Sequence, residues 1–200
     1  MTTINHHADY PGFSGVPGLV IGLVMNLAGR SAARLVADLA GLSATDRVID
    51  VGCGPGTAVR EAARRGARVI GIDPAPVMLR LARALTSERE SITWIEGTAE
   101  DLRLPDASVN VLWTLASVHH WKDVRAGLDE AWRVLTPGGR LLALERQVRP
   151  GATGLASHGW TGQQAGAFAA LCRTVGFDNV RVEKHRAGRR EVYIVRAVKP

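Results

Sequence analysis

The stretch that decides the fold is Val48-Ile49-Asp50-Val51-Gly52-Cys53-Gly54-Pro55-Gly56-Thr57. Its apolar start predicts a buried strand, and a helix is expected from Thr57 onward. Between them, glycines let the backbone turn tightly and approach a ligand without side-chain clash. They alternate as G-x-G-x-G, whereas a dinucleotide site has G-x-G-x-x-G, whose third glycine would fall on Thr57. With Asp50 ahead of it, the loop suits a ligand with an ammonium group better than a pyrophosphate.

Three further motifs follow at regular intervals. Val69-Ile70-Gly71-Ile72-Asp73 is a second strand that ends in an acid, and residues 74–78 open the next helix. Residues 97–106 form a loop with the sequence GTAEDLRLPD, and residues 133–145 read RVLTPGGRLLALE. Together with the glycine loop, these motifs resemble those of the class I S-adenosylmethionine-dependent methyltransferases. The resemblance runs from about Arg47 to Glu145, and four motifs in order are far more specific than one glycine loop.

The resemblance and the alternation of strands and helices predict an α/β fold. We expect a Rossmann-like, doubly wound, seven-stranded sheet, mostly parallel with an antiparallel C-terminal strand and with helices on both faces. The expected strands are 47–51, 68–72, 92–96, 109–114 and 139–145. The expected helices are 32–40, 57–65, 75–86, 124–135 and 162–175. Alternation in residues 179–184 and 191–196, around Gly188, predicts a C-terminal hairpin.

The chain is expected to form a single domain over residues 1–200. Within it, residues 1–41 would cover the site, residues 47–145 would bind the cofactor, and residues 150–200 would add a loop, a helix and the hairpin. The apolar run from Val16 to Ala28 is shorter than the roughly 20 residues that cross a bilayer. We expect a helix packed on the domain, and the alternatives are a wall of the acceptor pocket or a lid that touches a membrane.

Composition is typical of a globular enzyme domain. The chain has 200 residues, 46% hydrophobic and 22% charged, which is enough for one hydrophobic core. Cys53 and Cys172 lie far apart, which predicts neither a zinc site nor a disulfide. With no secretory signal visible, the expected compartment is the cytoplasm, and the expected state is a monomer or homodimer. No cluster of metal ligands is apparent in the sequence, so no metal cofactor is expected.

The resemblance implies S-adenosylmethionine as cofactor and S-adenosylhomocysteine as product. The glycine loop would hold the methionine part, with Asp50 facing the ammonium group, and Asp73 would bind both ribose hydroxyls. The alternatives are a loop-fixing carboxylate for Asp50 and a helix cap for Asp73. The expected cofactor contacts are Asp50, Gly52, Cys53, Gly54, Gly56, Asp73, Pro74, Met78, Thr98, Ala99, Glu100, Thr114 and Leu115.

The chain departs from the family pattern at two places. Thr98 stands where an Asp or Asn is usual, so the adenine amine loses its common partner. Glu100 could replace that partner or could be an ordinary acid at a helix start. Val109-Asn110 stands where Phe-Asp is common, a change to which we attach no function. Met78 could contact adenine or belong to the core.

Residues 114–121, with the sequence TLASVHHW, would face both the cofactor and the acceptor. They lack the N/D-P-P-Y sequence of enzymes that methylate planar amino groups. Histidine is the side chain best suited to take a proton near neutral pH, so His119 is the first candidate base and His158 the second, although a His-His pair often packs in a core. Candidate substrate-binding residues are Tyr10, Phe13, His120 and Trp160.

The predicted function is methyl transfer to a small, partly apolar molecule by direct displacement. The net charge of +6 and the arginines of the C-terminal tail leave an RNA methyltransferase as an alternative. However, the tail has few aromatic residues, so nucleic acid is an unlikely partner. A module that binds S-adenosylmethionine without catalysis is a further alternative.

Overall fold

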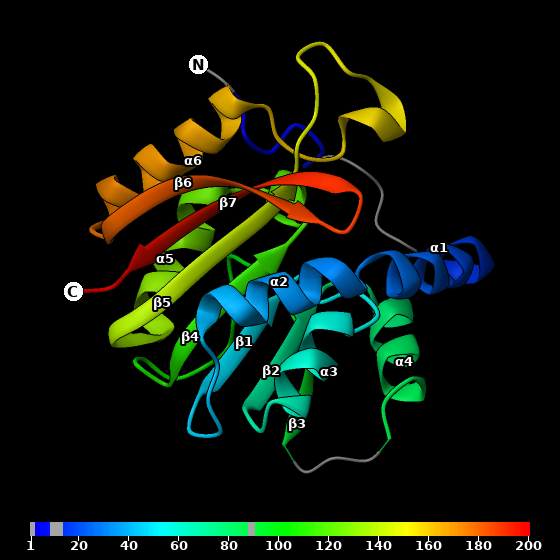
Figure 1. Cartoon of the computed structure of the whole chain (residues 1–200). Coiled ribbons are helices and arrows are strands. Elements are labelled where there is room, and N and C mark those ends of the chain that lie inside the picture. Colours follow the sequence, from blue (N-terminus) through cyan, green and yellow to red (C-terminus); the bar gives the residue numbers. More distant parts are fainter. Residues whose placement is uncertain (1–2, 9–13, 88–90) are drawn as a thin grey trace.

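The computed structural model describes residues 3–8, 14–87 and 91–200, which form a seven-stranded sheet (Figure 1). The strand order is β3-β2-β1-β4-β5-β7-β6. Strands β1 to β5 run parallel, whereas β7 is antiparallel to both β5 and β6. The strands are β1 (Arg47–Val51), β2 (Arg68–Asp73), β3 (Ile92–Glu96), β4 (Val109–Leu115), β5 (Leu135–Arg146), β6 (Asp178–Ala187) and β7 (Arg190–Val198).

The helices cover both faces of the sheet, as expected. Helices α2, α3 and α4 lie over one face, and α5 and α6 lie over the other (Figure 1). Helix α1 lies beyond the sheet and packs on α4. The α-helices are α1 (Gly15–Ala28), α2 (Arg30–Ala40), α3 (Thr57–Arg64), α4 (Pro76–Ala84), α5 (Val124–Val134) and α6 (Gly162–Val175).

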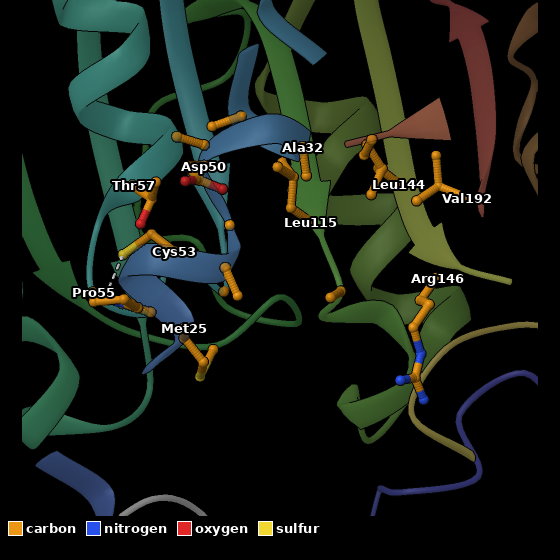
Figure 2. A pocket seen from close by; sticks show the side chains of 18 of the residues that line it. Met25, Ala32, Asp50, Cys53, Pro55, Thr57, Leu115, Leu144, Arg146 and Val192 are labelled. Carbon is orange, nitrogen blue, oxygen red and sulfur yellow. Dashed lines mark hydrogen bonds between the residues drawn. The ribbon is translucent and has the colours of Figure 1, made fainter. Parts of the chain in front are cut away.

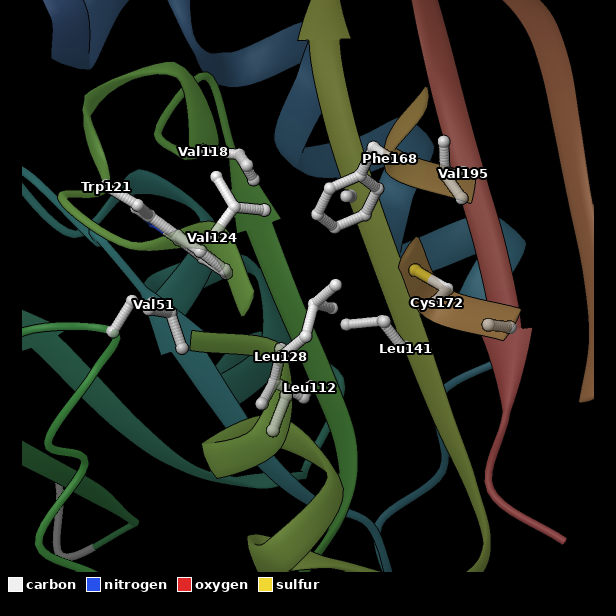
Figure 3. Close-up of a cluster of buried hydrophobic side chains, with 14 of the residues drawn as sticks. Val51, Leu112, Val118, Trp121, Val124, Leu128, Leu141, Phe168, Cys172 and Val195 are labelled. Carbon is white, nitrogen blue, oxygen red and sulfur yellow. The ribbon is translucent and has the colours of Figure 1, made fainter. Parts of the chain in front are cut away.

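Alternating side chains of the central strands build two hydrophobic cores. Val48 and Val111, which pair between β1 and β4, lie in the core beneath α2 and α3. Ile49 and Leu112, one residue further along, lie in the core beneath α5 and α6. Figure 3 shows the second core, in which Leu112 and Leu141 of the sheet lie in one cluster with Leu128 of α5 and Phe168 of α6. Burial of both faces explains why these strands read as continuous apolar runs.

Several boundaries differ from the sequence expectation, and for two of them the structure shows the cause. Strand β5 begins at Leu135 rather than at 139, because residues 135–139 join β4 through a register shift. A Pro-Gly-Gly sequence inside a strand is read as a turn, and Gly138 has a φ of +75°. Helix α2 begins at Arg30, because only Gly29 separates it from α1. In contrast, β3 and α6 have the predicted limits, and Thr161 and Gln164 form the expected capping box.

Helix α1 presents much of its apolar surface to solvent. Its large hydrophobic residues that are exposed are Leu19, Val20, Ile21, Leu23, Val24 and Leu27. Within the described residues, no single helix is long and apolar enough to cross a membrane. The segments Pro17–Ala28 and Arg30–Ala40 meet that length and composition only as a pair, bent by 53°.

Candidate functional site

A cavity of about 270 Å³ lies beside the glycine loop, at the carboxyl ends of β1, β4 and β5 (Figure 2). Ligands of open parallel sheets bind at this end, where the strand order reverses. The walls come from the α1–α2 junction, the glycine loop, the end of β4 and the β5–β7 edge. The residues that line the cavity include Met25, Asp50, Gly52, Leu115, Arg146 and Arg190.

The glycine loop needs glycine at its first position for two reasons. Gly52 has a φ of +74°, a conformation that costs other residues roughly 1–2 kcal/mol. A Cβ atom there would lie 1.9 Å from Oγ of Ser117. That hydroxyl also accepts a hydrogen bond from Nε1 of Trp121 at 3.1 Å. The loop after β1 and the loop after β4 therefore touch at Gly52, which leaves the backbone open toward the cavity.

Asp50 is a buried carboxylate that lines the cavity. Its Oδ1 atom has no hydrogen-bond partner within the described residues. Burial raises the pKa of Asp50 to about 8, and the nearby carboxylate of Asp73 contributes to the rise. A buried carboxylate oxygen without a partner is costly, and a cationic group in the cavity would satisfy it. The site therefore fits the ammonium group of the expected cofactor.

Asp73 holds the glycine loop and the start of α4 together. Its Oδ2 accepts a hydrogen bond from the amide of Gly54 at 2.7 Å, and its Oδ1 accepts one from the amide of Ala75 at 2.9 Å. Asp73 is not the helix cap of α4, because the N-cap position is Ala75 and no side chain caps the first turn. Each carboxylate oxygen of Asp73 retains a second lone pair, so its two backbone contacts do not exclude binding of ribose hydroxyls.

The adenine side of the expected cofactor site is covered by α1. Met25 packs against Ala75, Val77 and Met78, and a Cβ atom at Gly22 would lie 3.1 Å from Sδ of Met78. The cavity is lined by Asp50, Gly52, Cys53, Gly54 and Leu115 but not by the other expected cofactor residues, which are Gly56, Asp73, Pro74, Met78, Thr98, Ala99, Glu100 and Thr114.

Glu100 has a structural partner of its own. Its Oε1 accepts hydrogen bonds from the amides of Lys122 and Asp123, at 2.8 and 3.1 Å. These residues lie just before α5, whose first turn is capped by the side chain of Asp123. Glu100 therefore fixes the entry to α5, and no helix begins at Glu100 itself.

His119 forms a fully buried pair with Glu145 at the end of β5. Nδ1 of His119 lies 2.8 Å from Oε2 of Glu145, and the two residues are 1% and 0% exposed. Nε2 of His119 has no hydrogen-bond partner within the described residues. If Nδ1 donates its proton to the carboxylate, the lone pair is on Nε2. With this geometry, Nε2 of His119 could accept a proton or bind a metal ion.

The other residues predicted to contact the methyl acceptor lie in different parts of the structure. Burial lowers the pKa of both His120 and His158 to about 4, and the neighbouring histidines contribute. Trp160 is fully buried in the hydrophobic core, with its ring 4.9 Å from that of Phe168. Trp160 therefore lies among core residues and does not line the cavity, and its contact with an acceptor stays a prediction. Tyr10 and Phe13 lie outside the described residues.

The wall of the cavity opposite the glycine loop consists of residues that were not predicted from the sequence. Arg146 of β5 and Arg190 of β7 line it, together with Leu144 and Val192. Arg146 also donates hydrogen bonds to the carbonyls of Ala156 and His158, which ties the loop after β5 to the cavity rim. No local motif marks these residues, since strand pairing alone brings β7 beside β5.

Comparison with known proteins adds independent evidence. Residues 49–143 match the model of a methyltransferase domain. The chain is 38% identical over 112 residues to a demethylmenaquinone methyltransferase of Tropheryma whipplei (strain Twist), an alignment that covers 56% of this chain and 46% of the relative. It is 33% identical over 162 residues to the 27-O-demethylrifamycin SV methyltransferase of Amycolatopsis mediterranei, covering 78% of this chain and 59% of the relative. The matched part is thus about half the length of these relatives.

A solved structure agrees with the fold. An S-adenosylmethionine-dependent methyltransferase from Aquifex aeolicus aligns with a TM-score of 0.75 at 17% identity, covering 91% of this chain and 98% of the other. The strand order, the glycine loop that follows β1 and the match to the methyltransferase-domain model all agree. The chain belongs to the class I S-adenosylmethionine-dependent methyltransferase family.

Proposed function

We propose that this protein transfers a methyl group from S-adenosylmethionine to a small, partly apolar molecule. The observation that carries the proposal is the cavity at the glycine loop, in which the unpartnered Oδ1 of Asp50 meets walls that are largely aliphatic. Both named relatives methylate small molecules according to their names. An apolar wall of Leu115, Leu144 and Val192 favours an acceptor of the same character.

The cofactor, when bound, supplies a methyl group on a positively charged sulfur, which an acceptor lone pair can displace. Asp50 would bind the ammonium group, and Gly52 and Gly54 would let the backbone approach the methionine part. Asp73 would bind the ribose hydroxyls while it holds the loop. The protein thus contributes alignment and exclusion of water, which in favourable cases supply about 7–11 kcal/mol of the barrier.

The cavity is too small for the cofactor and the acceptor together. Its 270 Å³ lies just below the range of about 300–1,000 Å³ for ligand pockets. Met25 closes the adenine side. We infer that α1 moves away from α4 when the cofactor binds, and that the described arrangement is the closed form of the site.

His119 is the group that we expect to take a proton from the acceptor in the metal-free enzyme. Glu145 holds its Nδ1 and stabilises the charged imidazole that would form. An acceptor that attacks through an unprotonated amine or an activated carbon would not need this step.

A methyl-transfer assay tests the proposal. The protein is incubated with labelled S-adenosylmethionine and a panel of quinols, phenols and other hydroxylated apolar molecules, and S-adenosylhomocysteine and the methylated product are measured. Binding of S-adenosylmethionine with no product from any acceptor class would favour a module without catalysis. Methyl incorporation into a structured RNA at physiological salt would overturn the small-molecule assignment.

A further inference from the structure

Five of the six histidines of the chain gather in one cluster beside the cavity. They come from three segments far apart in the sequence: His6 and His7, His119 and His120, and His158. The ring centroids of His119 and His120 lie 4.2 Å apart, and each lies 5.4 Å from that of His158. Arg146 connects this cluster to the cavity, since it lines the cavity and its Nε donates a hydrogen bond to the carbonyl oxygen of His158.

Three members of the cluster have the spacing of metal ligands. One ring nitrogen each from His119, His120 and His158 lie within 4.8 Å of one another. Zinc binds histidine nitrogens at about 2.0–2.1 Å, which places tetrahedral ligands about 3.3 Å apart. Each nitrogen has to move by at most about 0.9 Å toward the centre of the three to reach that distance. Small side-chain rotations supply such a movement.

The surroundings of His119 are those of a ligand rather than of a packing residue. Metal-binding histidines usually donate their second ring N–H to a carboxylate or a backbone carbonyl. Glu145 takes this position beside Nδ1 of His119, and the buried Nε2 is left without a partner. Glu145 also needs a compensating positive charge, because its carboxylate is fully buried and its Oε1 has no partner either.

The orientation of the other rings agrees with this arrangement. Nδ1 of His120 lies 3.4 Å from the carbonyl oxygen of His7, a long contact of the same kind. His6 has a different role, because its Nδ1 accepts from Gln164 and its Nε2 donates to the carbonyl of Ser157. His6 therefore attaches the N-terminal arm to the loop that carries His158, and helps to bring the ligands together.

We propose that His119, His120 and His158 bind one divalent transition-metal ion, for which zinc is the best fit, with Glu145 orienting His119. Three neutral imidazoles are a common donor set for zinc, and the fourth position stays open to water or to an acceptor oxygen. An oxygen bound there would lose its proton more readily. Metal and proton compete for Nε2 of His119, so the metal-loaded enzyme would not use that nitrogen as a base.

The test uses the untagged 200-residue chain, because an added histidine tag would bind the same ions. Protein stripped with a chelator is titrated with Co²⁺, followed by visible absorption, and with Zn²⁺, followed by calorimetry. We expect one ion per chain and the absorption of a four-coordinate site. Metal binding is measured without a methyl acceptor, so its result does not depend on whether the protein transfers a methyl group.

Matched variants locate the ion. His158→Ala and His120→Ala, both at half-buried positions, should weaken binding by more than the 10–100-fold that loss of an orienting partner typically costs. Glu145→Gln should weaken binding by about 10–100-fold. His185→Ala is the control, because His185 lies on β6 and bonds to Glu183, and it should change nothing. Absence of one-to-one binding, or binding that survives both His158→Ala and His120→Ala, would overturn the proposal.

Discussion

Oδ2 of Asp73, at the end of β2, accepts a hydrogen bond of 2.7 Å from the amide of Gly54 in the loop that follows β1. The residue expected to bind ribose thus also fixes the loop expected to bind methionine. The two ends of the cofactor site are coupled through one buried carboxylate, and loss of that carboxylate affects both ends.

Asp73→Ala should weaken binding of S-adenosylhomocysteine by about 1–3 kcal/mol, the usual cost of losing hydrogen bonds to a charged group. It should also lower the melting temperature, because the amide of Gly54 loses its partner. Calorimetry and thermal unfolding measure the two effects. Asp129→Ala, at an exposed residue paired with Arg125, is the control. Unchanged affinity in Asp73→Ala would contradict the assignment of ribose to Asp73.

Gly52→Ala should destabilise the fold through a clash with Ser117 and through backbone strain. The double variant Gly52→Ala/Ser117→Gly removes the clash but leaves the left-handed backbone, which costs about 1–2 kcal/mol. Urea unfolding should therefore rank the double variant between Gly52→Ala and the parent. Gly166→Ala is the control, since a Cβ atom in that helix meets nothing within 4 Å. Equal stability of Gly52→Ala and the parent would show that the loop adjusts freely.

Binding of S-adenosylmethionine at pH 7 should release a proton from Asp50. With a pKa of about 8 in the free protein, about nine-tenths of Asp50 is protonated at pH 7. A bound ammonium group favours the carboxylate and lowers its pKa, so affinity should rise from pH 6 to 8 and level off above. Calorimetry in buffers of different ionisation enthalpy gives the number of protons released on binding. In Asp50→Asn the count should fall to zero, and an unchanged count would assign the proton elsewhere.

His119→Ala should lower kcat of the metal-stripped enzyme at least tenfold, since general-base catalysis contributes about 10²–10⁴-fold. Affinity for S-adenosylhomocysteine should stay nearly intact, because His119 is not a cofactor contact. Turnover, cofactor affinity and melting temperature are measured together, because His119 is the more buried of the two adjacent histidines. Full turnover in a folded His119→Ala protein would show that no base is needed.

Hydrogen exchange tests the movement of α1. If α1 must leave α4 to admit adenine, S-adenosylhomocysteine should speed exchange of the amides of residues 18–28 relative to those of α6. Helix α6 is the internal control, because it packs on the opposite face of the sheet. Unchanged or slower exchange in α1 would show that the cofactor enters without displacing it.

Most of the fold could be predicted from the sequence because its signals are local. Buried strands read as apolar runs, and the capping box at Thr161 gives the start of α6 directly. The start of β5 could not be predicted, because its pairing with β4 overrides the Pro-Gly-Gly sequence. The break between α1 and α2 was predicted, but the start of α2 was not, because Arg30 and Ser31 read as a linker although they belong to the helix.

The candidate site was predictable only where one motif contains it. Asp50 and the glycine loop were found because they are contiguous, and Leu115 because it ends a strand. The histidine cluster could not be foreseen, since 151 positions of chain separate His7 from His158 and only folding brings them together. For the same reason, the sequence did not indicate the close spacing of His119, His120 and His158 or the packing of Trp160 among core residues.

The arginine-rich tail has a structural consequence of its own. Strand β6 forms one edge of the sheet, where unpaired backbone groups could recruit a strand from another molecule. Arg181, Lys184 and Arg186 are exposed along it, and its register shifts near Asn179. Charge and irregular backbone both oppose such pairing. These basic residues therefore protect the folded protein from aggregating through its open edge, a benefit that requires no nucleic-acid partner.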